Sequence, residues 1–251
     1  MIRYRKIALA ALAAPLALGL AACDSAGDAT SGEVAEGAAI APIEAPEGTQ
    51  WTDQVVRTEM DGYLLGNPDA PIKVIEYASL TCPACASFAM TGADPLKQDY
   101  VNSGRVSFEL RNQVHNGLDL ILARIVRCGA PESFHPLSEQ VWLNLQAILQ
   151  RAQANPDALE QAMNLPEDQR FVAAAGAAGF YDFFASRGIS IDQAQICLAD
   201  FASVQQIAEN SRSQSDELNV TGTPTFIVNG VNVGTQNWAS LEPLLQRAGA
   251  R

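Results

Sequence analysis

Two cysteines separated by two residues, Cys82 and Cys85, are the side chains of this sequence with the clearest capacity for chemistry. They follow a β-branched, mostly apolar run (residues 72–77) and precede a helix-forming run, which predicts that Cys82 lies at a helix N-terminus. Unpaired N–H groups and the helix dipole favour an anion there and lower the pKa of a thiol from about 8.5. Such a pair can close into a disulfide and reopen.

The same spacing occurs in zinc sites, which need two further ligands at a fitting spacing. The sequence has no second Cys-x-x-Cys, and its two histidines, His115 and His135, form no paired ligand motif. We therefore expect no metal site. A purely structural bridge is another alternative, but closing so short a loop constrains the unfolded chain little. The pattern favours a redox-active pair that needs no separate cofactor.

The N-terminus indicates the compartment. Basic residues within positions 1–6 precede an uncharged run rich in Ala and Leu, which is typical of a secretory signal and short for a membrane span. The run ends Leu20-Ala21-Ala22-Cys23, which resembles the lipobox of bacterial lipoproteins and implies a lipid on Cys23. Cleavage at an ordinary small-residue site, with Cys23 incidental, is the alternative. We expect a lipid-anchored protein on the periplasmic side of the bacterial cell envelope.

The segment after Cys23 is acidic and has no pattern of a folded element. Residues 24–50 carry six acids (Asp24, Asp28, Glu33, Glu36, Glu44 and Glu47), no basic side chain and no aromatic residue. Such a composition predicts a flexible tether. The formal net charge of −12 argues against binding to nucleic acid or to anionic lipid through a basic surface.

From Trp51 onward, strand signals surround a helical block. Strands over residues 51–65, 72–77 and 105–113, with a helix to about residue 100, predict a βαβ unit. Strand signals return at residues 223–228, and Asn229-Gly230 predicts a hairpin. We expect five parts: a signal peptide with lipobox (1–22), a lipid-anchored acidic flexible tether (23–50), the first part of a sheet domain (51–115), an all-helical insertion (116–219) and its second part (220–251).

Several motifs together resemble one known family. They are the turn at residues 66–71, the Glu76-Tyr77 pair, the Cys-x-x-Cys, and the segment Gly222-Thr223-Pro224-Thr225. The combination resembles the DsbA-like branch of the thioredoxin superfamily from about residue 53 to the C-terminus. It implies an α/β, thioredoxin-like fold with a large all-helical insertion.

The resemblance also implies roles for matching residues. Cys82 resembles the exposed nucleophile, Cys85 the buried resolving thiol, and Pro224 a cis-proline facing the disulfide. From the residues alone, a plain strand-opening proline is equally compatible with Pro224. The residues expected to contact a bound partner chain are Thr223, Pro83 and Ala84.

Glu76 lies six residues before Cys82, where the family often has a buried acid. A carboxylate in an apolar site has a raised pKa and could carry the proton of Cys85 through water. Alternation along the strand alone leaves an outward-facing Glu76 equally compatible.

Cys128 and Cys197 remain. In an oxidising compartment two such cysteines usually pair, and closing so long a loop would contribute about 4 kcal/mol in the loop-entropy model. Two buried free thiols or a second redox pair are alternatives, but compartment and cysteine count favour a structural disulfide.

We therefore expect a monomeric protein thiol–disulfide oxidoreductase that forms disulfides in exported proteins. Its implied partners are exported proteins with thiols, a membrane redox partner that reoxidises the dithiol, and the membrane itself through Cys23. Strong oxidants of the family commonly have histidine where this chain has Ala84, so a weaker oxidant is expected. The alternatives are an envelope reductase or isomerase of the same fold, and a metal-handling binding protein that uses the Cys82–Cys85 pair as ligands.

Overall fold

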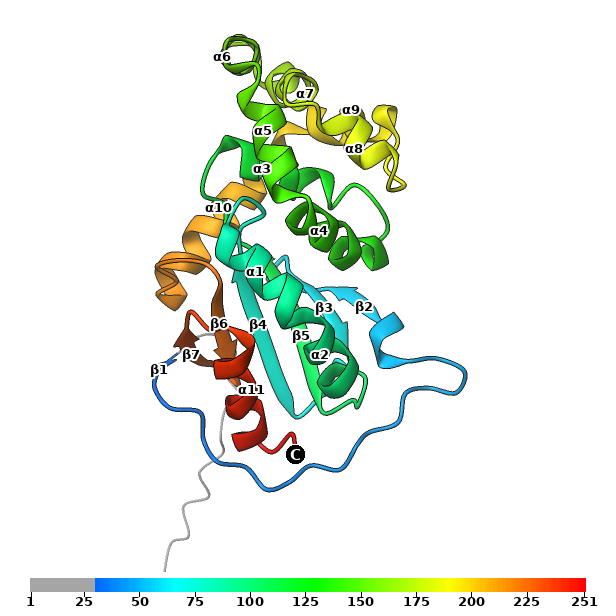
Figure 1. The fold of residues 1–251 in the computed structure, drawn as a ribbon, viewed down its shortest axis with the longest axis vertical. Helices are drawn as coiled ribbons and strands as arrows, with labels where there is room; N and C mark the ends of the chain where they lie inside the picture. Colours follow the sequence, from blue (N-terminus) through cyan, green and yellow to red (C-terminus); the bar gives the residue numbers. More distant parts are fainter. Residues whose placement is uncertain (1–29) are drawn as a thin grey trace, which may run out of the picture.

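A seven-stranded mixed sheet organises the computed structural model, which describes residues 30–251 (Figure 1). The strand order is β1-β7-β6-β4-β5-β3-β2, so β4 lies in the centre between parallel β5 and antiparallel β6. The parallel β4–β5 pair confirms the predicted βαβ unit. The strands are β1 (Thr30–Ser31), β2 (Val55–Arg57), β3 (Tyr63–Gly66), β4 (Ile72–Ala78), β5 (Val106–Asn112), β6 (Thr225–Val228) and β7 (Val231–Gly234).

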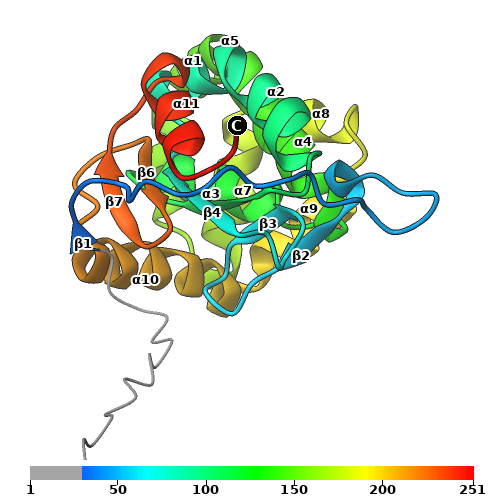
Figure 2. The same ribbon diagram turned by 90° about the horizontal axis from the view of Figure 1, so that it is seen from below.

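Helices cover both faces of this sheet (Figure 2). One face carries α1, α2 and α11, and the other carries α10, whose C-terminal Leu218 packs with Tyr77 and Ile227 of the sheet. Because both faces are covered, Ile72, Val74, Tyr77 and Ala78 of β4 are almost fully buried. These elements are α1 (Pro83–Thr91), α2 (Ala93–Pro95), a π-helical segment η2 (Leu96–Val101), α10 (Phe201–Leu218) and α11 (Trp238–Arg247).

The helical insertion lies at the end of the sheet where β4 leads into α1 (Figure 1). One apolar core runs without interruption from Val74 and Phe226 of the sheet to Leu122, Phe134 and Phe184 of the insertion. The insertion and the sheet therefore stabilise each other. Its helices are α3 (Gly117–Ile125), α4 (Phe134–Leu143), α5 (Leu145–Gln153), α6 (Pro156–Met163), α7 (Glu167–Ala177), α8 (Phe180–Ala185) and α9 (Ile191–Ala199), with a 3-10 turn η3 (Pro131–Ser133).

The predicted single strand over residues 51–65 is wrong. The chain forms a 3-10 turn, η1 (Trp51–Asp53), and then the antiparallel hairpin β2–β3. The reversal occurs at Asp61, whose φ of 61° is left-handed, followed by Gly62. An Asp-Gly pair is a strong hairpin signal, because both residue types tolerate the conformations of a tight turn.

The expectation of a flexible tether also needs correction for residues 30–50, which we call the N-terminal strap. The strap runs along the folded domain at the end of the sheet away from the helical insertion (Figures 1 and 2). The backbone N–H groups of Gly37, Ile40 and Ile43 each donate a 2.9 Å hydrogen bond to a carbonyl of the domain, and Val34 is buried. An extended segment held mainly through its backbone needs no apolar periodicity, so composition gave no sign of it.

The predicted signal peptide (1–22), the lipidation site Cys23 and the start of the tether lie outside the described residues. Within residues 30–251, none of the helices combines the length and the apolar character needed to cross a membrane.

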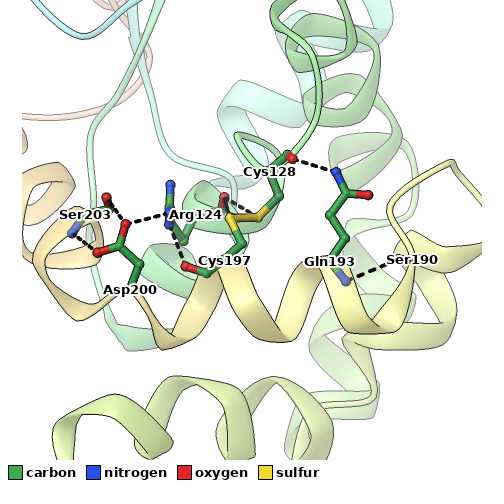
Figure 3. Close-up of a disulfide and its surroundings, with 7 residues drawn as sticks. All are labelled: Arg124, Cys128, Ser190, Gln193, Cys197, Asp200 and Ser203. Carbon is green, nitrogen blue, oxygen red and sulfur yellow. Dashed lines mark hydrogen bonds and ion pairs between the residues drawn. A yellow bond between two sulfur atoms is a disulfide. The ribbon is translucent and has the colours of Figure 1, made fainter.

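The structure contains the disulfide between Cys128 and Cys197 that the sequence favoured (Figure 3). It joins the segment after α3 to α9 across 69 positions of sequence. Arg124 Nε donates a 3.0 Å hydrogen bond to the Cys197 carbonyl, and Gln193 Nε2 donates a 2.7 Å bond to the Cys128 carbonyl. The bridge therefore fixes two helices of the insertion to each other.

Removing this bridge with the double substitution Cys128→Ser and Cys197→Ser should lower the free energy of unfolding by about 4 kcal/mol, because the unfolded chain regains the entropy of a long open loop. Urea unfolding of both proteins, each with Cys82 and Cys85 reduced, measures the difference. Equal midpoints would show that the bridge does not stabilise the insertion.

Candidate active site

Cys82 occupies the junction between the central strand and the first helix. β4 ends at Ala78, and the loop Ser79–Thr81 leads to Cys82, which is the N-cap of α1 in an extended conformation (φ −89°, ψ 122°). Pro83 takes the first helical position, where its missing N–H costs no hydrogen bond. Cys82 is partly exposed, whereas Cys85, one turn further, is fully buried.

The pKa values of the Cys82 and Cys85 thiols are shifted in opposite directions. A hydrogen bond from Cys85 is the largest influence that lowers the pKa of Cys82, to about 5, and further bonds from Thr223 and from the backbone at Cys85 and Ala84 act in the same direction. Burial raises the pKa of Cys85, and the bond to Cys82 and the charge of Glu76 raise it further. At neutral pH the site therefore holds one thiolate at the surface and one thiol beneath it.

The loop before β6 forms the second wall of the site. The Thr223–Pro224 peptide bond is cis, and the Thr223 carbonyl oxygen lies 3.4 Å from Cys82 Sγ. Pairing of Tyr77 with Thr225 across β4 and β6 brings this loop beside the cysteines. The cis geometry agrees with the family resemblance. Thr223 lies beside the partly exposed Cys82 sulfur, and Pro83 and Ala84, which follow Cys82 in the chain, are exposed.

Glu76 is buried, with 3% of its surface exposed, so the inward-facing alternative is the observed one. Burial raises its pKa to about 8, and the negative charges of Cys82 and Glu139 add to this effect. Within residues 30–251, none of the ion pairs includes Glu76. A carboxyl group in this state can give or take a proton near neutral pH.

The insertion holds the loop before Cys82 through three hydrogen bonds. Trp142 Nε1 donates to the Ser79 carbonyl at 2.9 Å, Asp119 Oδ1 accepts from Leu80 N at 2.8 Å, and Asn116 Nδ2 donates to Thr81 Oγ1 at 3.2 Å. Sequence analysis missed these residues. The one available signal was Asp119, an acid on the otherwise apolar face of α3.

His115 is a second residue that sequence analysis did not connect to the site. Its Nε2 lies 3.5 Å from Thr223 Oγ1, so an exposed imidazole borders the cis-proline loop. The other histidine, His135, is buried and its Nε2 bonds to the Tyr63 carbonyl at 2.9 Å. Among residues 30–251, no three His, Cys, Asp or Glu side chains are grouped as metal ligands.

These features define a class of proteins. Its members combine a thioredoxin-like sheet with a helical insertion and have a Cys-x-x-Cys at the start of the first helix. The family model described as thioredoxin matches residues 58–247. The chain therefore belongs to the thioredoxin family.

Individual similar proteins support this placement. A crystal structure of protein-disulfide isomerase from Novosphingobium aromaticivorans is 32% identical, with a TM-score of 0.68 over 73% of this chain and 94% of that one. Wolbachia pipientis alpha-DsbA1 is 19% identical and shares the fold, with a TM-score of 0.60 over 75% of this chain and 91% of that one.

The similar curated proteins include a longer one from Rickettsia bellii, named "Putative protein-disulfide oxidoreductase". It is 24% identical over 185 residues, which are 74% of this chain. The match spans only 63% of the length of the Rickettsia bellii protein.

The charge state of Cys82 is directly testable. Its alkylation by iodoacetamide should rise with pH through a midpoint near 5, because only the thiolate reacts. Replacing its main hydrogen-bond donor with Cys85→Ala should move the midpoint to higher pH. Ultraviolet absorbance of the thiolate gives an independent titration of Cys82. A midpoint near the ordinary thiol value of about 8.5 in the unaltered protein would contradict the arrangement described here.

Proposed function

We propose that this protein is a thiol–disulfide oxidoreductase that acts through Cys82 and Cys85. The observation that carries this proposal is the opposite protonation of the two thiols at the N-terminus of α1. The low pKa of Cys82 makes it both a nucleophile at neutral pH and a good leaving group. The buried Cys85 is protected from outside reagents but lies next to the Cys82 sulfur, so it can resolve a mixed disulfide.

In the oxidising direction, a partner thiolate attacks Cys82 Sγ of the closed disulfide. The Cys82–Cys85 bond breaks, a bond from Cys82 to the partner forms, and Cys85 leaves with the electron pair and takes a proton from Glu76. A second partner thiolate then attacks the partner sulfur bound to Cys82, which forms the partner disulfide and releases Cys82 as a stable thiolate. Two electrons pass from the partner to the enzyme.

The walls of the site support recognition of an extended chain. The Thr223 carbonyl oxygen, just before Pro224, lies 3.4 Å from Cys82 Sγ, and Pro83 and Ala84, which follow Cys82, are exposed. Backbone groups at such a loop can bond any polypeptide in extended form, irrespective of its side chains. This fits a substrate class defined by exposed thiols rather than by sequence.

We assign the direction as disulfide formation. A thiolate with a pKa near 5 stabilises the reduced enzyme, and a stabilised reduced form makes the disulfide a better oxidant. The rival is a reductase or isomerase of the same fold. It is favoured by the name of the Novosphingobium aromaticivorans neighbour and by Ala84, which offers no charge to Cys82.

The cellular setting is part of the proposal. The signal-like N-terminus and the lipobox at Cys23 support a protein held on the periplasmic side of the bacterial envelope by lipid. Its partners would be exported proteins with free thiols and a membrane protein that reoxidises the dithiol. The domain would act as a monomer.

Serine substitutions test the mechanism. Cys82→Ser should abolish exchange with a reduced, unfolded substrate protein, because the nucleophile and leaving group are lost. Cys85→Ser should instead accumulate a mixed disulfide on Cys82, seen as a thiol-sensitive adduct by non-reducing electrophoresis and mass spectrometry. Exchange that persists in Cys82→Ser would disprove the assignment of roles.

The reduction potential of the Cys82–Cys85 pair distinguishes disulfide formation from disulfide reduction. Equilibration of Cys82 and Cys85 with glutathione buffers should give a value of about −120 to −180 mV, the range of disulfide donors. The variant Cys128→Ser with Cys197→Ser serves as a control that the titrating pair is the one at α1. A value near −270 mV would identify a reductase.

A further inference from the structure

Glu76 faces a small cavity behind the active site. The cavity has about 10 Å³ of room for the centre of a water molecule, which is about what one water requires. Its apolar walls come from α1, β5 and α4, with Phe88, Phe108 and Trp142 among them. The polar side chains that reach it, besides Glu76, are those of His135 and Glu139.

Glu139 connects this cavity to the outside of the protein. Its two carboxylate oxygens accept hydrogen bonds from Lys97 Nζ at 2.8 and 3.0 Å, and its side chain is 25% exposed. Lys97 also lies 3.4 Å from the exposed Asp94. The cavity thus has a buried acid on one wall and a partly exposed, ion-paired acid on another.

The other charged groups around Glu76 are few. Cys82 and Cys85 lie on the side of α1, and Glu139, His135 and, behind Glu139, Lys97 lie on the side of α4 and η2. On the neighbouring strands Glu76 is paired with apolar residues, Leu110 of β5 and Phe226 of β6.

His135 does not serve as a carrier of protons in this cavity. Its Nε2 donates to the Tyr63 carbonyl, and burial lowers the pKa of the imidazole to about 4, so the ring stays neutral. This leaves Glu139 as the acid that can exchange protons with Glu76 across one water.

We propose that Glu139 is the second acid of a proton relay, which connects Glu76 through the cavity to solvent beside Lys97. The inference rests on the proposed function, since it concerns the proton that Cys85 gains and loses. Lys97 lies in η2, which follows the C-terminal end of α1, whereas Cys82 lies at the N-terminal end of that helix. Protons can therefore enter and leave while a partner chain covers the exposed sulfur.

The relay acts when Cys85 attacks the mixed disulfide between Cys82 and a partner. Cys85 gives its proton to the Glu76 carboxylate, and its sulfur electron pair forms the bond to Cys82 Sγ. The partner sulfur leaves Cys82 with the electrons of the broken bond. Glu76 passes the proton through one water to Glu139, which releases it to solvent. Opening of the disulfide uses the same route in reverse.

Lys97 suits Glu139 to this task. The ion pair with the Lys97 ammonium holds the Glu139 carboxylate in place at the wall of the cavity, and the partial exposure of Glu139 brings it into contact with solvent. The negative charge of Glu139 also raises the pKa of Glu76, which keeps the buried acid within reach of neutral pH. Glu139 thus both raises the pKa of Glu76 and connects Glu76 to solvent.

A two-phase reaction separates the relay from the rest of the mechanism. Reduced full-length protein, carrying Cys23→Ser and an intact Cys128–Cys197 bridge, is mixed rapidly with 5,5′-dithiobis(2-nitrobenzoate). Attack by Cys82 releases the first coloured thiolate, and closure by Cys85 releases the second. Only the second phase requires Cys85 to lose its proton.

We expect Glu139→Gln to leave the first phase unchanged and to slow the second by about tenfold or more, as loss of a positioned proton-transfer group does. The second phase should rise with pH through a midpoint near 8 in the parent protein and at lower pH in Glu139→Gln, because a like charge near Glu76 is gone.

The matched control is Asp94→Asn, which removes an acid beside the same lysine but outside the cavity. It should leave both phases and the midpoint unchanged. Equal second phases in the two variants, or slowing of both phases in Glu139→Gln, would each overturn the relay. Absence of the first phase in the parent would instead overturn the proposed function.

Discussion

The hydrogen bond from the Cys85 thiol to the Cys82 sulfur sets the chemical character of this site. It exists because Cys85 is fully buried and keeps its proton, while Cys82 stands at the first turn of α1 and loses its own. The bond weakens if either condition fails. Burial of one sulfur depends on the sheet, α1 and the helical insertion together, so the property of two atoms depends on the packing of the whole domain.

The insertion is part of the active site rather than an addition to it. Trp142 and Asp119 hold the loop that ends at Cys82, and both belong to helices that share one apolar core with the sheet. Leaving a buried carbonyl or N–H of this loop without a partner would cost about 1–3 kcal/mol for each group. Rigid support of this kind fixes the position of Cys82 against Thr223, which an exchange reaction through an extended partner chain requires.

Local sequence signals predicted the sheet, the hairpin at Asn229-Gly230 and the cysteine pair, because turn chemistry and strand periodicity act over a few residues. These local signals failed where burial depends on contacts between elements that are far apart in sequence. The burial of Glu76 depends on α4, which is far away in sequence, and alternation along β4 could not distinguish its two faces. His115 and Trp142 carry no mark of their role, since their partners come from other elements. The hairpin at Asp61-Gly62 did carry a signal, the Asp-Gly pair, although apolar residues on both sides of it suggested a single strand.

The N-terminal strap changes where the folded unit begins. Composition would suggest cutting the chain at Trp51, yet the carbonyls of Ser103, Arg247 and Gly249 are bonded by strap residues, and Val34 fills an apolar site. A chain shortened to that point would expose this surface and release the last residues after α11. Limited proteolysis should therefore spare residues 34–43, which carry these contacts, and physical measurements belong on a protein that retains the whole strap.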